Sequence, residues 1–234
     1  MAKRLWMQKF ARWHIWLGWL VGVPILMWLA TGLFMVLKPF EEVRGEDLHV
    51  PVEQQALPAG STTSVTVPTS ERPVRSVSLA MDGDQVVTTL NYEDGSVERY
   101  GEDGERIAPL NEIAARMLVE ERIEGGDDFA SATFYEADDV PFDFRRPQPV
   151  WRVALEDGTY VYVGRDTGKI EAVRTRWWRW FDFMWGLHIM DLETREPSNH
   201  PIILIFGTLA TFGAILGCIL MFRRRKARIK VPRG

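Results

Sequence analysis

Two long stretches without a charged side chain constrain this chain more than any other feature. The first runs from Ile15 to Leu37 and the second from Pro201 to Phe222. Each is about 22 residues long, which at ~1.5 Å per residue matches the ~30 Å hydrocarbon core of a bilayer. A buried helix of a soluble protein normally keeps a polar face, and neither stretch has one. We therefore predict two transmembrane helices, at residues 13–37 and 200–222.

The first stretch has the composition of an uncleaved anchor rather than of a signal peptide. The basic residues before it, Lys3, Arg4, Lys9 and Arg12, fit either kind of segment. The apolar core of a signal peptide is only ~7–15 residues long, however, and is followed by a cleavage site with small residues. No such site follows here, since the sequence continues as Lys38-Pro39-Phe40.

Basic residues flank both predicted spans on one side only. Residues 1–12 contain four Lys or Arg, and the second span runs directly into a basic tail at 223–234. An excess of Lys and Arg marks the cytoplasmic side of a membrane protein. We therefore predict that both termini are cytoplasmic and that residues 38 to about 176 lie outside the cytoplasm. The basic tail is typical of a stop-transfer signal that also contacts anionic lipid, so we expect no nucleic-acid partner.

The residues between the spans predict a linker and then a folded domain. Residues 38–73 are rich in Pro, Ser and Thr and favour a linker, with one short strand at Thr63–Val67. Residues 74–176 alternate in the manner of β-strands around Asp-Gly dipeptides, which favour hairpin turns. Asn111 to Ile123 has the pattern of a helix with Asn111 as its N-cap. The single cysteine, Cys218, lies in the second span, so the domain has no disulfide.

Two stretches of this domain resemble each other. The segment Glu93–Ile107 aligns with Glu156–Ile170, with an offset of 63 residues at the first turn and 64 at the second. One interpretation is a duplicated unit of a hairpin with a helix, which would give an α+β domain with helices on one face of an antiparallel sheet. The other is that two Asp-Gly hairpins are alike by chance.

Several motifs resemble a known family. Pro149–Val163 followed by Asp166–Ile170 resembles the PepSY domain signature. The entry into the first span at Arg12–Gly18, Thr31–Leu33 near its end, and Trp185–His188 before the second span resemble the PepSY-associated transmembrane family.

This resemblance implies a protein of the bacterial inner membrane with an α+β fold. Two transmembrane helices would flank a periplasmic PepSY-like domain of antiparallel sheet plus helices. Some larger relatives are reductases that act on ferric siderophores with membrane-bound haem, and isolated PepSY domains are associated with inhibiting or regulating peptidases. The larger reductase-like members typically have four spans, whereas this chain has two.

His14 is the first of three candidate haem ligands, because imidazole is a good ligand for haem iron. It lies where the first span leaves the cytoplasmic interface. Gly18 and Gly22 follow at one-turn intervals, and their missing side chains would let a flat macrocycle lie against the helix. The alternative is that His14 belongs to a belt of interfacial tryptophans and that the glycines serve helix packing.

His188 and His200 lie at the opposite end of the spans. About 33 Å of helix separates them from His14, so His14 cannot share one iron with either. A haem b with two histidine ligands would need His188 with His200, or His14 with a second chain. The alternative for His188 is an aromatic interfacial segment at residues 177–199, and for His200 a helix-entry position. We assign no role to His49.

No hydrolytic or phosphate-binding motif is present, and we name no catalytic residue. Four aromatic residues of the domain fit either a ligand groove or ordinary strand positions. They are Tyr100, Trp151, Tyr160 and Tyr162.

The expected function is that of a non-catalytic, partner-binding accessory subunit, in iron or siderophore uptake. The alternative is a haem b-binding subunit that transfers electrons across the membrane, and a purely structural subunit is a third reading. Expected partners are the lipid bilayer, another membrane subunit or a second copy, and a periplasmic protein. Gly18-x-x-x-Gly22 and Gly213-x-x-x-Gly217 predict spans that pack on each other or on a second chain.

Overall fold

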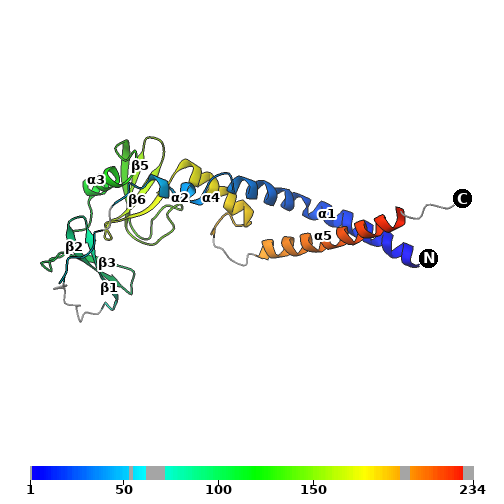
Figure 1. The fold of residues 1–234 in the computed structure, drawn as a ribbon, viewed down its shortest axis with the longest axis horizontal. Coiled ribbons are helices and arrows are strands. Elements are labelled where there is room, and N and C mark those ends of the chain that lie inside the picture. The colour runs from blue at the N-terminus through cyan, green and yellow to red at the C-terminus, as the bar shows by residue number, and fades with distance from the viewer. Residues whose placement is uncertain (1, 53–54, 62–71, 196–200, 229–234) are drawn as a thin grey trace. The chain divides into compact units, whose positions relative to one another are not determined.

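The computed structural model describes residues 2–52, 55–61, 72–195 and 201–228 (Figure 1). The predicted strand at Thr63–Val67 and the histidine at position 200 lie outside these residues. The chain forms two compact units, one of residues 1–38 with 180–234 and one of residues 39–179. Its helices and strands, in order, are α1 (Ala2–Met35), α2 (Phe40–Arg44), a 3-10 turn (Glu46–Leu48), β1 (Val74–Asp82), β2 (Gln85–Tyr92), β3 (Val97–Tyr100), α3 (Glu112–Arg122), β4 (Phe129–Tyr135), β5 (Val150–Leu155), β6 (Tyr160–Gly164), β7 (Ile170–Arg174), α4 (Arg176–His188) and α5 (Pro201–Arg228).

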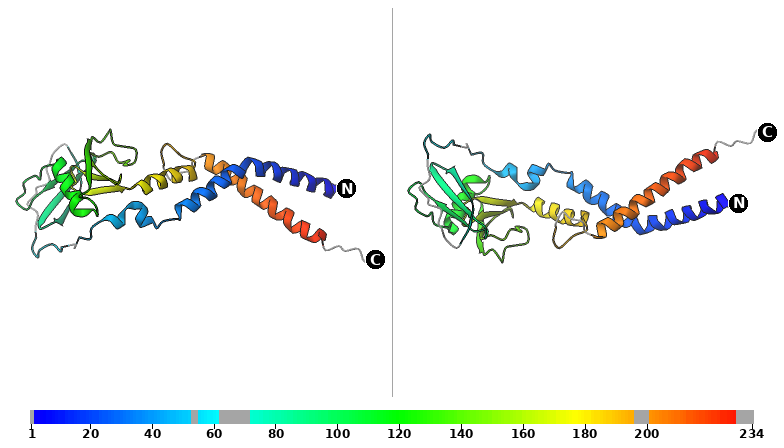
Figure 2. Two further views of the ribbon diagram at one scale, coloured as in Figure 1. Left: turned by 90° about the horizontal axis from the view of Figure 1, so that it is seen from above. Right: turned by 90° about the horizontal axis from the view of Figure 1, so that it is seen from below.

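The first unit contains both predicted spans. Trp6–Met35 of α1 and Pro201–Phe222 of α5 are long and apolar enough to cross a membrane, which confirms the two transmembrane helices predicted from the uncharged stretches. The two helices cross in the views of Figure 2. At their contact, Leu17 of α1 packs against Gly213 of α5, where an added Cβ would lie 3.3 Å from the leucine. The glycine thus lets the two backbones approach closely.

The second unit holds two antiparallel sheets rather than one. Strands β1, β2 and β3 form the first sheet in that order, and β4, β5, β6 and β7 form the second. Helix α3 covers one face of the second sheet, where Ala115, Val119 and Ile123 meet a row of buried valines from β5, β6 and β7. These apolar side chains alternate along each strand, as a sheet with one face on a core requires.

The predicted helix between the hairpins is confirmed. Helix α3 begins after Asn111, whose side chain accepts a hydrogen bond from the amide of Ala114 at 2.9 Å. The stretch predicted as a linker contains α2 and the 3-10 turn, and a backbone hydrogen bond of 2.9 Å from Val50 to Arg122 ties its continuation to the end of α3.

The two similar sequence stretches fold into turns with the same local geometry. In Asp94–Ser96 and Asp157–Thr159, the amide of the third residue donates to the aspartate Oδ1, at 2.9 Å and 2.7 Å. The middle glycine of each has a positive φ, 85° and 84°, which side chains with a Cβ rarely adopt. The copies belong to different sheets, and α3 is the one described helix of the unit between them.

Candidate functional site

His14 joins α1 to α5. Its Nδ1 lies 3.1 Å from the backbone oxygen of Gly213, and because a carbonyl can only accept, Nδ1 is the donor. The ring reaches this oxygen because Gly217 has no side chain, since an added Cβ there would lie 2.9 Å from the Cε1 of His14. The bond requires hydrogen on Nδ1, so in the neutral ring the lone pair is on Nε2.

His188, the last residue of α4, joins α4 to α1. Its Nδ1 lies 2.9 Å from the hydroxyl of Thr31, which donates its own hydrogen to the backbone oxygen of Met27 at 2.7 Å. The hydroxyl therefore accepts from His188 Nδ1–H. Trp28 adds a second bond, from its indole nitrogen to the backbone oxygen of His188 at 2.8 Å. In the neutral form of this ring as well, the lone pair is on Nε2.

The two histidines are too far apart to share one iron. His14 and Thr31, the partner of His188, are separated along α1 by about 25 Å at ~1.5 Å per residue. Among the described residues, no group of three or more His, Cys, Asp or Glu is placed to hold a metal ion. His49 pairs through its backbone with Ile123 in the other unit. Within a single chain, the described residues around His14 and around His188 therefore offer one histidine ligand at each site.

The surroundings of Gly18 and Gly22 in α1 differ from those of His14. An added Cβ at Gly18 or Gly22 would meet nothing within 4 Å, whereas the ring of His14 lies against α5. Gly213 and Gly217 pack against Leu17 and His14 of α1, which confirms that the spans pack on each other through the α5 glycines. Gly18 and Gly22 do not contact α5, and their packing on a second chain stays a prediction.

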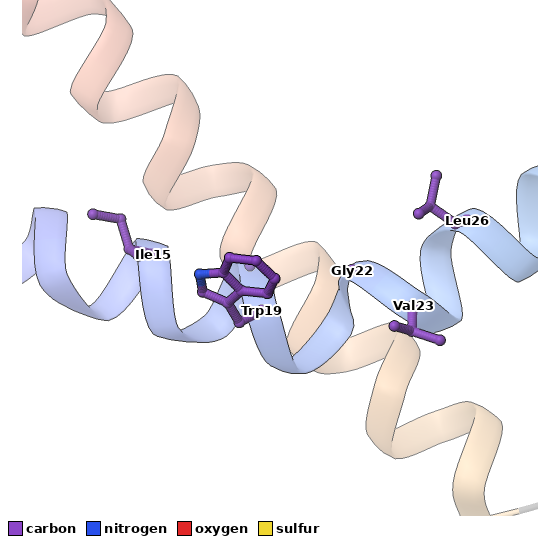
Figure 3. Close-up of a pocket in the computed structure, with 6 residues that line it drawn as sticks. Ile15, Trp19, Gly22, Val23 and Leu26 are labelled. Atoms are coloured by element: carbon purple, nitrogen blue, oxygen red, sulfur yellow. The ribbon is translucent and has the colours of Figure 1, made fainter.

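An apolar groove lies along this stretch of α1. It has a volume of about 350 Å³ and is lined by Ile15, Gly18, Trp19, Gly22, Val23 and Leu26. Figure 3 shows the larger of these side chains projecting from α1 around Gly22. Trp19 is 79% exposed, so one wall of the groove is a tryptophan that no other part of the described chain covers.

A buried ion pair joins Asp182 of α4 to Arg195 beyond the end of that helix, and no sequence pattern predicted it. Arg195 Nε lies 3.5 Å from Asp182 Oδ2, and both side chains are almost fully buried. The guanidinium packs on Gly186, where an added Cβ would lie 2.4 Å from its Cζ. The glycine of the Trp185–His188 motif thus makes room for this arginine.

The four aromatic residues considered for a ligand groove do not line one surface. The Tyr100 hydroxyl donates to Glu98 in the first sheet at 2.8 Å. Trp151 belongs to the α3 face of the second sheet and donates to the backbone oxygen of Leu110 at 2.9 Å. Tyr160 and Tyr162 point to the opposite face of that sheet, because their neighbours in β6 belong to the α3 face.

Glu98 organises a polar cluster on the first sheet. It accepts hydrogen bonds from Tyr92 at 2.7 Å and from Tyr100. Burial opposes its ionisation, but these bonds and the charges of Arg106 and Arg72 prevail, so the pKa of Glu98 lies below its usual value. Burial and the bond to Glu98 raise the pKa of Tyr92 to about 12. These hydrogen bonds and charges stabilise the first sheet.

The comparisons identify the family. A family model described as the PepSY-associated TM region matches residues 11–234. This chain belongs to the PepSY-associated transmembrane family. No curated protein and no solved structure matches it. The match extends over both apolar helices and the domain between them, so the molecule is a membrane protein with a PepSY domain.

Proposed function

We propose that this PepSY-associated protein is a non-catalytic accessory subunit of the bacterial inner membrane that binds a partner. Some larger relatives reduce ferric siderophores, so we place the proposed accessory role in iron uptake. The orientation that we propose has both termini in the cytoplasm and the PepSY domain in the periplasm, because Lys and Arg are concentrated before the first span and after the second.

The observation that carries this proposal is the use made of the two membrane histidines. His14 and His188 each form a hydrogen bond between helices through Nδ1, the first to Gly213 and the second to Thr31. Each histidine therefore has a role in the packing of α1 with α5 or α4 that requires no haem. The groove at Gly18 and the exposed Trp19 remain open to a further transmembrane helix.

The orientation is tested with a reporter that is active only in the periplasm. Fused after Gly234 it should be silent, and inserted within the exposed loop at Pro58–Gly60 it should be active. The opposite pattern overturns the orientation.

Partner binding is tested by purifying the tagged full chain in mild detergent. We expect a fixed partner, or a second copy, to co-purify with the wild type and to be lost on Gly18→Leu, because leucine fills the groove. The matched control is Leu20→Phe, which adds bulk at an exposed position of α1 outside the groove. A chain that purifies alone and monomeric contradicts the proposal.

A second candidate function is haem binding, and it is favoured by the lone pair on Nε2 of each histidine. Histidine ligands of metals commonly donate Nδ1–H to an oxygen, as His14 and His188 do. A haem b bound there would supply one-electron redox chemistry. His14 would hold a haem together with a residue of another chain, and His188 would do so with His200, which lies outside the described residues, or with another chain.

The haem candidate is tested by reduced-minus-oxidised spectra of protein from haem-replete cells. It predicts a haem band that His14→Ala or His188→Ala diminishes and that the control His49→Ala leaves intact. If the wild type shows no band, or both variants keep all of it, the haem candidate fails and the accessory role remains.

A further inference from the structure

The face of the second sheet that points away from α3 carries arginines among aromatic rings. Arg152 of β5 pairs with Tyr162 of β6, and Tyr160 of β6 pairs with Arg174 of β7. Since side chains two residues apart in a strand share a face, both arginines lie on the same side as the two tyrosines. Arg179, in the first turn of α4, lies over the ring of Tyr160 at 4.7 Å from its centroid.

Arg152 is held by aromatic rings rather than by an acid. Its guanidinium lies 5.0 Å from the ring centroid of Tyr135 and 4.8 Å from that of Tyr160. Its Nε is buried and has no hydrogen-bond partner among the described residues. Burying a polar group without a partner is unfavourable, so a hydrogen bond from Arg152 to an added acceptor would be stabilising.

Within the described part of the chain, the hydrogen bonds of Arg174 and Arg179 go to backbone oxygens. Arg174 donates from Nε to the backbone oxygen of Asp143 at 2.7 Å and stacks on Trp178 at 4.1 Å. Arg179 donates to the backbone oxygens of Gly158 at 2.6 Å and of Arg174 at 3.0 Å. Desolvation by burial lowers the pKa of Arg174 to about 10, so it stays protonated at neutral pH at a cost that an anion would relieve.

The carboxylates near these arginines have other partners. Asp143 Oδ1 accepts the hydroxyl of Tyr162 at 2.6 Å, and Glu171 forms its ion pair with Arg146 at 3.0 Å. No described carboxylate forms an ion pair with any of the three arginines around Tyr160. Arg152 and Arg179 therefore both lie against the ring of Tyr160, and Arg179 also bonds to the backbone oxygen of Arg174, on which the charge of Asp143 acts.

We propose that Arg152, Arg174 and Arg179 bind the phosphate of an anionic phospholipid headgroup. Guanidinium groups present paired donors that match the oxygens of a phosphate. The lipid source follows from the chain itself, because α4 begins beside this cluster and continues without interruption into an aromatic stretch. That stretch includes Trp180, which is 58% exposed, and the Trp180–Phe183 ring pair, and such residues favour the membrane interface.

The test uses the full chain in a mild nonionic detergent with short-chain lipids as probes. Binding of dihexanoyl phosphatidylglycerol is compared by calorimetry with that of dihexanoyl phosphatidylcholine for the wild type and for a double variant, Arg152→Gln with Arg174→Gln. We expect the wild type to prefer the anionic lipid and the double variant to bind it about tenfold or more weakly, because it loses hydrogen bonds to a charged group. The preference should also weaken as salt is raised.

Arg116→Gln is the matched control. Arg116 is an exposed arginine of α3 that stacks on Phe129 at 4.4 Å from its centroid, so its loss removes the same charge and a similar ring contact elsewhere. It should leave the preference unchanged. If the double variant is less folded by circular dichroism, Arg152→Lys with Arg174→Lys replaces it. That variant keeps the charge, loses the paired donors, and should bind several-fold more weakly than the wild type.

Four results overturn the proposal. The wild type shows no preference for the anionic lipid, the arginine variant keeps the preference, or Arg116→Gln loses it equally. The fourth is that another anion takes the site as tightly as the lipid, with inorganic phosphate indicating a soluble ligand and a glutamate-rich peptide indicating a protein partner.

Discussion

The contact of His14 with α5 gives the sharpest prediction, and Gly217→Ala is the change that tests it. The added methyl would lie 2.9 Å from Cε1 and 3.4 Å from Nε2 of His14. Cβ atoms do not come this close to a ring carbon without a shift of one group. The imidazole must therefore move, and its bond to the Gly213 oxygen must lengthen or break.

The magnitude follows from two terms. Extra bulk in a packed contact typically costs about 1–3 kcal/mol, and a hydrogen bond between transmembrane helices contributes about 0.6 and at most about 1.7 kcal/mol. Glycine to alanine also gains about 1 kcal/mol of helix propensity. Gly18→Ala gains the same propensity with no atom within 4 Å of its Cβ, so the difference between these variants isolates the contact. We expect Gly217→Ala to be less stable than Gly18→Ala by about 1–3 kcal/mol.

The assay is denaturation of the full chain by sodium dodecyl sulfate in mixed micelles, followed by tryptophan fluorescence. Both variants are repeated with His14→Ala, which removes the ring that the methyl would meet. In that background the difference between Gly217→Ala and Gly18→Ala should disappear. Equal stabilities in the wild-type background, or a difference that persists without His14, would refute the contact.

Three further outcomes follow from single contacts. Thr31→Val keeps the shape of the side chain but removes the acceptor of His188, so stability in the same assay should fall by about 0.5–1.5 kcal/mol. Asn111→Ala removes the N-cap of α3 and should cost about 1 kcal/mol, measured by thermal unfolding in detergent. The raised pKa of Tyr92 means that its contribution to stability is fully present below pH ~10 and is lost as the pH rises toward about 12, so the thermal midpoint should fall across that window. Tyr92→Phe should flatten that fall.

Each of these outcomes has a control. Thr211→Val alters a threonine of α5 that bonds only within its own helix, to the Gly207 oxygen, and it should cost less than Thr31→Val. Glu112→Ala changes the residue after the cap without removing a described hydrogen bond, and a loss as large as that of Asn111→Ala would contradict the capping argument. A thermal midpoint that falls equally with and without Tyr92 would assign the alkaline loss to other groups.

Local rules accounted for the elements of this protein because they depend on neighbouring residues alone. An uncharged stretch of about 22 residues has few options other than a spanning helix, and both such stretches became α1 and α5. Asn111 capped α3 because its side chain needs only an amide three residues ahead. The Asp-Gly turns formed at Gly95 and Gly158 because glycine tolerates a positive φ.

The site depended on which face each residue presents to a distant part of the chain, and periodicity does not contain that information. Gly18 and Gly213 are each the first glycine of a Gly-x-x-x-Gly motif, yet Gly18 faces away from α5 and Gly213 packs on Leu17. His14 found its partner 199 residues away, and Gly186 made room for Arg195 beyond the end of α4. Local backbone preferences and the length of the apolar stretches set which segments become helices and turns. Contacts between segments remote in the chain set which histidines are bonded, which glycines are open and which of the described arginines lack an acid.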